Sequence, residues 1–143
     1  MCIRDRVDQG FLSEAEADCL NRRAIKAFFQ SSLFKRMMES DMLEREYQFI
    51  YEITAGEVDD TLKPPFSEER ILIQGIADAV FIEDGELVIV DYKTDRMRNP
   101  SDFAEKYADQ LRIYKEALRQ YFELPVKECL IYSLHLATEI KVW

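Results

Sequence analysis

Apolar residues recur at steps of three and four along the first part of the chain, which is the spacing of a helix. Ser13, followed three residues later by Glu16, forms a capping-box signal that starts this pattern. A polar break at Ser31-Ser32 divides it, so residues 13–39 are expected to form one bent helix or two or three shorter ones. Residues 1–12 are treated as a ragged or foreign start outside the fold, because their opening shows no period and leads into no capped element.

Strand patterns follow this helical region. Between residues 44 and 54, every second position from Tyr47 to Ile53 is apolar, which predicts a strand with one buried face. Residues 55–69 are polar and hold Gly56 and Pro64-Pro65, so they are expected to form a long loop.

Two β-rich runs, residues 70–82 and 86–92, flank the dipeptide Asp84-Gly85. This dipeptide between apolar runs is the strongest short-range signal for a two-residue hairpin turn. Both runs contain stretches that are apolar on both faces, which is typical of central strands covered on both sides of a sheet.

The last third of the chain predicts a helix and two closing strands. Asn99-Pro100 is a helix-start signal, with Asn as the cap, and the helix is expected to end near Phe122. Residues 126–134 and 138–143 are expected to form strands. The resulting order, α-β-β-β-α-β-β, is that of an α/β fold in which residues 13–143 form a single domain.

Composition narrows the class of protein. The chain has 143 residues, of which 48% are hydrophobic, and this fits one globular domain. Without an apolar run of about 18 residues or a signal-peptide pattern, it is expected to be cytoplasmic and to have no membrane partner. Its three cysteines, Cys2, Cys19 and Cys129, are scattered, so neither a disulfide framework nor a zinc or iron–sulfur site is expected. The chain has no G-x-x-x-x-G-K-[ST] motif, so no ATP site is expected in it.

The predicted hairpin brings two aspartates together. Counting outward from the Asp84-Gly85 turn pairs Ile82 with Leu87 and Asp78 with Asp91. Residues paired in this way have Cβ atoms about 4.5 to 5.5 Å apart, and like charges at this spacing destabilise a sheet. Lys93 lies two residues beyond Asp91 and therefore projects from the same face.

Two interpretations of this cluster stay open at the level of the residues. In the first, Lys93 only neutralises the aspartates, or the strands end there and all three side chains are solvated. In the second, the carboxylates hold a hard divalent cation, since Mg²⁺ is bound by one or two carboxylates with water and substrate phosphate. Lys93 would then position or help to deprotonate the attacking water and offset charge on phosphorus, so the reaction would be phosphodiester hydrolysis.

These residues also resemble a known family. Gln74-Gly75-Ile76-Ala77-Asp78, then Val90-Asp91-Tyr92-Lys93-Thr94-Asp95, then Gln110 and Tyr114 resemble the G-x-x-D, D-Y-K and Q-x-x-x-Y series of RecB-like nucleases in the PD-(D/E)XK superfamily. The likeness is in particular to the C-terminal nuclease domains of AddA-type helicase–nucleases. It extends from about Phe28 to the C-terminus and includes Arg45-Glu46 and Phe49.

The resemblance implies a restriction-endonuclease-like fold, with a central mixed β-sheet flanked by helices. It also implies Mg²⁺-dependent cleavage of DNA, with Mn²⁺ as a possible substitute, in an exonuclease that acts in double-strand break repair and recombination. By the same resemblance the partners are DNA, the helicase part of a longer parent chain and an AddB-like subunit. An iron–sulfur cluster of the kind that some relatives hold with four cysteines is not expected here.

By this resemblance, Asp78 and Asp91 bind the metal, Lys93 is catalytic, and Gln110 and Tyr114 support Lys93 or touch substrate. The backbone carbonyl of Tyr92 is a further ligand. RecB itself supplies a histidine from its first helix near the metal, whereas the only histidine here, His135, falls in a predicted closing strand. Glu46 is therefore the candidate for the upstream ligand, the alternative being a glutamate on the strand surface. Gln110 and Tyr114 lie four residues apart on one helical face, which is also the pattern of an ordinary amphipathic edge.

The formal net charge of −9 is unusual for a protein that handles DNA. Either the acidic residues form a solvated surface, or other domains deliver the DNA, and in both cases the chain alone should bind DNA poorly. A non-cleaving binding or scaffolding module of the same fold is the main alternative, which the intact Asp78, Asp91 and Lys93 disfavour. A stand-alone nuclease is a further alternative, which the acidity disfavours.

Overall fold

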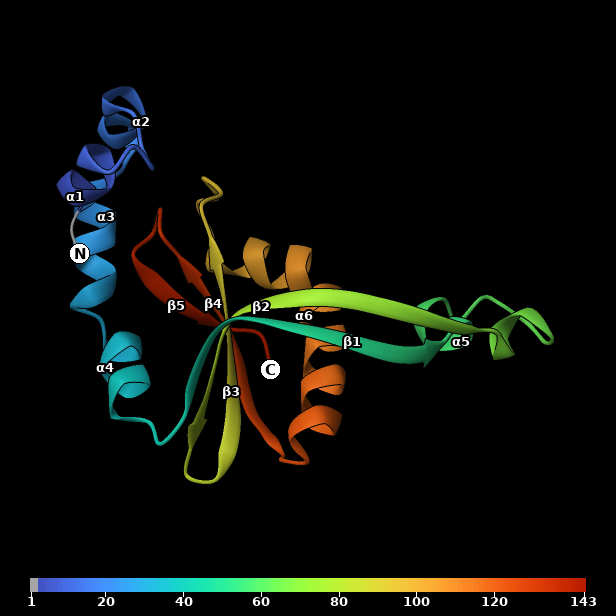
Figure 1. Cartoon of the computed structure of the whole chain (residues 1–143). Helices are drawn as coiled ribbons and strands as arrows, with labels where there is room; N and C mark the ends of the chain where they lie inside the picture. The colour runs from blue at the N-terminus through green and yellow to red at the C-terminus, as the bar shows by residue number, and fades with distance from the viewer. Residues whose placement is uncertain (1–2) are drawn as a thin grey trace.

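A five-stranded mixed β-sheet forms the centre of the computed structural model, which describes residues 3–143 (Figure 1). The strands lie in the order β1-β2-β3-β4-β5, and every neighbouring pair is antiparallel except β3 and β4, which are parallel. This arrangement confirms the predicted α/β class and the mixed sheet. The strands are β1 (Leu43–Thr54), β2 (Arg70–Glu83), β3 (Glu86–Lys93), β4 (Val126–Ser133) and β5 (Thr138–Lys141).

The first helical region is three short helices, α2 (Glu14–Cys19), α3 (Arg22–Phe29) and α4 (Ser32–Glu39). Each begins at a polar cap. The capping box predicted at Ser13 is present, and the Ser31 hydroxyl accepts a hydrogen bond from the Phe34 N–H, so the chain breaks where the pattern predicted. A short polar cap satisfies N–H groups that have no partner inside the helix.

Two segments that were expected to lack helices contain short ones. Helix α1 (Ile3–Asp8) lies within the predicted foreign start, and a salt bridge of 2.9 Å from Arg4 to Glu14 ties it to α2. Six residues make fewer than two helical turns, so α1 is too short to show a period in the sequence. Met1 and Cys2 lie outside the described residues.

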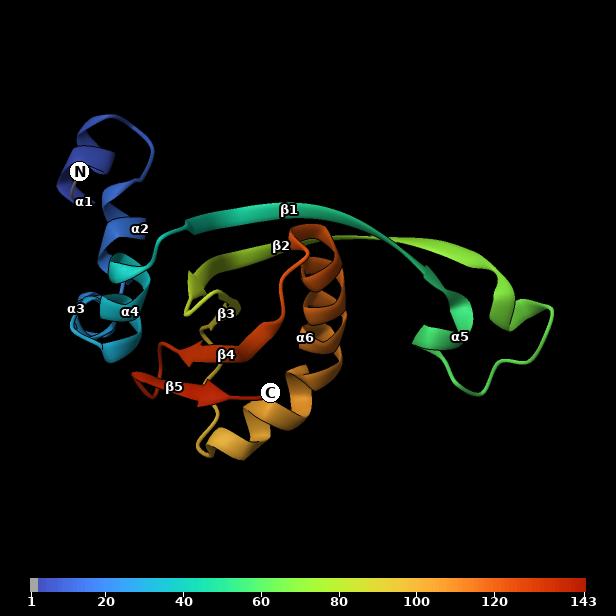
Figure 2. The ribbon, with the colours of Figure 1, turned by 90° about the horizontal axis from the view of Figure 1, so that it is seen from below.

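The expected loop over residues 55–69 is likewise partly helical, with α5 (Ala55–Val58) and the 3₁₀ helix η1 (Phe66–Glu68). Thr54 and Glu57 form a capping box at the start of α5, a signal that the loop prediction overlooked. These turns close the far end of β1 and β2, which form a long curved ribbon that extends beyond α6 (Figure 2).

The hairpin between β2 and β3 has the predicted turn. Asp84 and Gly85 both have left-handed backbones, with φ of 56° and 79°, as a type I′ turn requires. The register runs from Glu83 opposite Glu86 to Ala79 opposite Val90, as counting outward from the turn predicts. The predicted register is therefore confirmed over this stretch.

Helix α6 (Pro100–Phe122) connects β3 to β4 and covers one face of the sheet, while α4 covers the other (Figure 2). Strand β3 is fully buried from Leu87 to Val90 because it contributes to both interfaces. Its alternate residues divide between two clusters. The α6-side cluster contains Leu87, Ile89, Phe103, Leu111 and Leu118, and the α4-side cluster contains Val88, Val90, Leu33 and Met37.

Two further sequence expectations concern the closing strands and membranes. Strand β4 ends at Ser133, so His135 lies in the turn before β5 and not in a strand as expected.

The described residues include no helix that is long and apolar enough to cross a membrane.

Candidate active site

The carboxylate of Asp78 lies at the point where β2 and β3 cease to pair regularly. The last regular pair on this side is Ala79 with Val90, so the predicted direct pairing of Asp78 with Asp91 is wrong. One residue further, Asp78 Oδ2 accepts a hydrogen bond of 2.7 Å from the backbone N–H of Tyr92. A side-chain oxygen thus takes the place of a backbone carbonyl, and the carboxylate is held beside β3.

A change of face in the neighbouring strands explains this placement. In β2, Ala77 packs in the α6-side cluster, whereas Ala79, two residues later, packs in the α4-side cluster. Regular alternation would put both on the same face. Strand β1 changes face opposite this point, where Glu46 has a left-handed φ of 52°. The paired irregularity interrupts both strands at Asp78 and leaves its side chain free to reach β3.

Asp91 and Lys93 form a close ion pair on the α6 side. Lys93 Nζ lies 2.6 Å from Asp91 Oδ2, and Asp91 is only 4% exposed. Oδ2 is buried, and the Lys93 ammonium is its one close partner among the described residues. Burial raises the pKa of Asp91, the nearby Lys93 ammonium opposes this rise, and the charge of Asp78 adds to it. One ammonium therefore faces two neighbouring carboxylates, one of them buried.

Two residues of one face of α6 hold Lys93, and a third holds one of these two. Its Nζ donates a hydrogen bond of 3.3 Å to Gln110 Oε1, and Gln110 Nε2 donates one of 3.1 Å to the Tyr114 hydroxyl. The ammonium also lies 4.2 Å from the centre of the Tyr107 ring, a cation–π contact. Gln110 and Tyr114 meet each other as their spacing predicts, and Gln110 reaches the lysine directly.

Tyr107 and Asp95 are residues of this site that sequence reasoning missed. The Tyr107 hydroxyl donates a hydrogen bond of 2.8 Å to Asp95, which also accepts one of 2.8 Å from Lys106. In the sequence, Tyr107 falls in the apolar stripe of the helix. Its position three residues before Gln110, one turn along the same face, was the available signal.

The glycine of the G-x-x-D series has a packing role. A Cβ on Gly75 would lie 2.4 Å from Cζ of Phe49, so any larger residue would displace that ring. Phe49 in turn contacts Tyr114 edge to face, with ring centres 5.1 Å apart. The absence of a side chain at position 75 therefore allows the contact between β1 and the helix that carries Gln110.

The residues present fit a hard divalent cation. The buried carboxylate of Asp91 lies beside Lys93, and Asp78 is close enough for its charge to raise the Asp91 pKa. Two carboxylates with water and substrate phosphate are a typical Mg²⁺ environment. Within residues 3–143, however, no three His, Cys, Asp or Glu side chains are grouped to hold a metal.

Two further predicted metal ligands are Glu46 and the backbone carbonyl of Tyr92. Glu46 is exposed on β1 and does not complete a three-carboxylate group with Asp78 and Asp91. Its role as the upstream ligand stays a prediction, as does that of the Tyr92 carbonyl. The Tyr92 side chain points away from the site and packs edge to face on Phe28, with ring centres 5.2 Å apart.

Comparison with known proteins assigns the chain to a family. The family model described as the PD-(D/E)XK nuclease superfamily matches residues 3–140. The chain belongs to the PD-(D/E)XK nuclease superfamily. The match begins inside the predicted foreign start, so the boundary at residue 12 is a prediction that the structure does not establish.

Curated relatives are much longer proteins, each named as the A subunit of an ATP-dependent helicase/nuclease. That of Clostridium perfringens (strain ATCC 13124) is 36% identical over 143 residues, covering 95% of this chain. That of Clostridium botulinum (strain Alaska E43 / Type E3) is 34% identical over 139 residues, covering 94%. That of Thermoanaerobacter sp. (strain X514) is 36% identical over 132 residues, covering 91%. The chain spans 11% of the length of each of these relatives.

Proposed function

We propose that this chain is the DNA-cleaving domain of a longer helicase–nuclease and hydrolyses phosphodiester bonds with Mg²⁺, or with Mn²⁺ in its place. The observation that carries the proposal is the buried Asp91 oxygen, which has Lys93 beside it and the Asp78 carboxylate nearby. Two neighbouring carboxylates that share one ammonium, one of them buried, are stabilised when a further cation binds between them. We infer that the charged end of β3, from Asp91 to Lys93, serves the chemistry of the site and not the stability of the fold.

In this proposal Asp78 and Asp91 hold the ion from neighbouring strands. When bound, the ion supplies positive charge that stabilises the transition state at phosphorus and makes water more acidic. Lys93 donates from Nζ to the attacking water or to a phosphoryl oxygen, and so offsets the charge that develops there. Gln110 and Tyr107 fix the direction of the ammonium, while Tyr114 fixes the amide of Gln110.

The relatives support a larger assembly. These relatives are named as subunits of an ATP-dependent helicase/nuclease. This chain corresponds to 11% of their length. We infer that the ATP-driven motor belongs to the rest of a parent chain, whose partner is an AddB-like subunit. The inferred role is exonucleolytic processing of double-strand breaks for recombination, in the cytoplasm.

The test is cleavage by the full-length parent with ATP and Mg²⁺. Lys93→Met and Asp91→Asn should each lower the cleavage rate by at least about 10²-fold, the effect of removing one charge-stabilising group, while unwinding persists. Lys35→Met is the matched control, because Lys35 is an exposed lysine on α4. Cleavage that persists in both site variants would show that the active site lies elsewhere.

A second experiment separates a domain to which DNA is delivered from a stand-alone nuclease. The net charge of −9 repels a polyanion at the distances where steering normally helps. At physiological salt, the isolated chain should therefore cut DNA at least about 100-fold more slowly than the parent, where delivery gives a high local concentration. Lower salt should not restore the rate, since weaker screening strengthens the repulsion. Equal rates would favour the stand-alone nuclease.

A further inference from the structure

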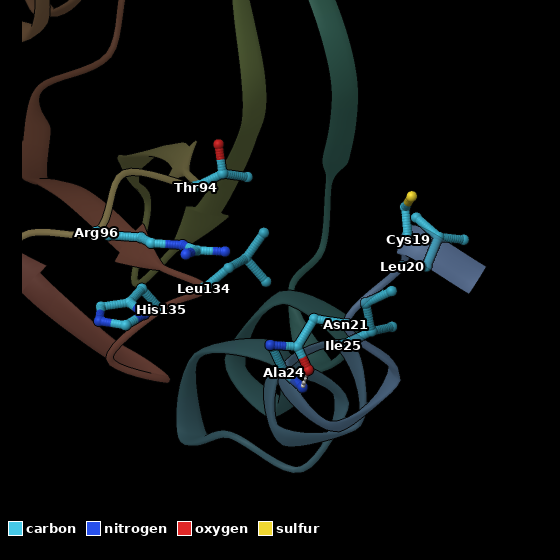
Figure 3. Close-up of a pocket in the computed structure, with 9 residues that line it drawn as sticks. All are labelled: Cys19, Leu20, Asn21, Ala24, Ile25, Thr94, Arg96, Leu134 and His135. Atoms are coloured by element: carbon cyan, nitrogen blue, oxygen red, sulfur yellow. Dashed lines mark hydrogen bonds between the residues drawn. The ribbon is translucent and has the colours of Figure 1, made fainter. Parts of the chain in front are cut away.

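A pocket of about 300 Å³ lies beside the candidate active site, at the carboxyl ends of β3 and β4 (Figure 3). These two strands are parallel, so their carboxyl ends meet at one edge of the sheet, the edge where α/β proteins bind ligands. The segment after β3 and the turn after β4 form one wall, and α2 and α3 form the other. Its lining residues are Cys19, Leu20, Asn21, Ala24, Ile25, Thr94, Arg96, Leu134 and His135.

The pocket continues directly from the catalytic lysine. Thr94 follows Lys93 in the chain, and the Leu134 N–H donates a hydrogen bond of 2.9 Å to the Lys93 carbonyl. Lys93 projects towards α6, whereas Tyr92 and Leu134 pack on the α4 side. The pocket therefore lies across the sheet edge from the Asp91–Lys93 pair, and a strand of DNA crossing this edge would pass from one to the other.

Arg96 gives the pocket a free positive charge. Its side chain extends from the segment after β3 towards the α3 wall (Figure 3). Asp95, the adjacent acid, is already bound to Lys106 and Tyr107. Among residues 3–143, Arg96 has neither a salt bridge nor a side-chain hydrogen bond, although acidic residues outnumber basic ones by 28 to 19. An unpaired arginine in so acidic a chain is available to an external anion.

The opposite wall adds a hydrogen-bond donor and apolar surface. Asn21 Oδ1 accepts a hydrogen bond of 3.1 Å from the Ala24 N–H, which caps α3 and leaves the amide NH₂ of Asn21 free to donate. Leu20, Ile25 and Leu134 provide an apolar surface of the kind that a sugar or base contacts. Arginine, amide and apolar groups together match a phosphate joined to a nucleoside better than they match a phosphate alone.

We propose that this pocket binds one nucleotide of the DNA strand next to the scissile phosphate, with Arg96 on its phosphate and Asn21 as a second donor. The inference rests on the proposed nuclease function and deepens it by naming a substrate subsite. The subsite supplies local affinity in a domain whose net charge disfavours DNA, and it fixes the position of the strand that enters or leaves the site.

The test is an NMR titration of the ¹⁵N-labelled chain with the 5′-phosphorylated dinucleotide pdTpdT, without divalent metal. The expected result is saturable shifts of the Asn21, Ala24, Thr94 and Arg96 amides. Arg96→Gln should raise the dissociation constant about tenfold, the effect of losing one charged hydrogen bond. Asn21→Asp should raise it similarly, because the carboxylate still caps α3 but repels phosphate. Lys63→Gln, which removes an exposed charge outside the pocket, should stay within about twofold of wild type.

Two comparisons complete the design. Inorganic phosphate should bind at least about tenfold more weakly than pdTpdT, and equal binding would show a plain anion site and overturn the nucleotide subsite. Unchanged pdTpdT binding in both pocket variants, or no shifts in the wild type, would also overturn it, while Lys93-dependent cleavage by the parent would leave the nuclease proposal standing. Loss of binding in both variants supports the subsite whatever the cleavage assay gives.

Discussion

Strand β3 contains two regions of opposite character within eight residues. From Leu87 to Val90 it is apolar and fully buried, and its residues alternate between the α6-side and α4-side clusters. From Asp91 to Lys93 it is also well enclosed, yet it carries a carboxylate and an ammonium. The first region stabilises the fold, whereas the second places a charge where burial opposes it. We infer that the stability supplied by the apolar half of the strand offsets the cost of burying charge in the other half.

The largest expected effect tests the apolar region. Ile89→Ala should lower the free energy of unfolding by about 2–5 kcal/mol, because it removes a fully buried side chain and leaves a cavity. Ile50→Ala is the matched control and should change it by less than about 0.5 kcal/mol, since Ile50 is 69% exposed on β1. Urea unfolding measures both. A comparable loss at the two positions would mean that β3 does not dominate the core.

The charged region should behave in the opposite way. Asp91→Asn keeps the shape of the side chain and removes a buried charge, while Lys93 retains Gln110 and Tyr107 as partners. We expect the free energy of unfolding at neutral pH to stay the same or to rise, with cleavage lost, as in other sites that trade stability for activity. A loss as large as that of Ile89→Ala would show that Asp91 is a structural residue.

The part of this contrast that depends on local patterns was predictable from the sequence. The Asp84-Gly85 turn predicts the register as far as Ala79 opposite Val90, but not the next step, where Asp78 accepts a hydrogen bond from the Tyr92 N–H instead of pairing with Asp91. The caps at Ser13 and Ser31 likewise marked real helix starts. Each of these features depends on residues within a few positions of one another.

The parts that depend on distant contacts were not predictable. The change of face at Glu46 and Asp78 depends on the left-handed backbone of a glutamate, which no residue preference indicates. The contact of Tyr107 with Lys93 depends on how α6 lies across the sheet. The apolar neighbours of His135 predict a strand there, whereas it lies in the turn before β5 and lines the pocket.

A smaller expected effect is the dependence of stability on pH, which should differ between Glu83 and Asp91. Hydrogen bonds from Arg36 and Lys127 hold the pKa of Glu83 down to about 2. The contribution of Glu83 to the free energy of unfolding is therefore present above its ordinary pKa and is lost as pH falls towards 2. Burial raises the pKa of Asp91. The contribution of Asp91 to the free energy of unfolding is therefore present at low pH and is lost as pH rises through this raised pKa. The urea midpoint, followed from acid to neutral pH, should therefore lose part of its acid-side fall in Glu83→Gln. In Asp91→Asn the midpoint should stay the same or rise relative to wild type at neutral pH. The reverse pattern would contradict these assignments.

The smallest expected effect concerns the residues that position Lys93. Tyr107→Leu should lower kcat about tenfold and leave KM unchanged, because a partly buried cation–π contact contributes about 1–2 kcal/mol. Tyr107→Phe keeps the ring but loses the bond to Asp95, and should recover most of this rate. Equal rates for the Leu and Phe variants would show that the ring does not orient the lysine.

Direct binding of a metal tests the central claim, that the charged end of β3 holds a divalent cation. Calorimetric titration of the folded chain with Mn²⁺ should show binding that weakens at least about tenfold in both Asp78→Asn and Asp91→Asn. Glu69→Gln, an exposed acid near the far end of the β1–β2 ribbon, should bind as the wild type does. Equal affinity in the wild type and both aspartate variants would contradict the account.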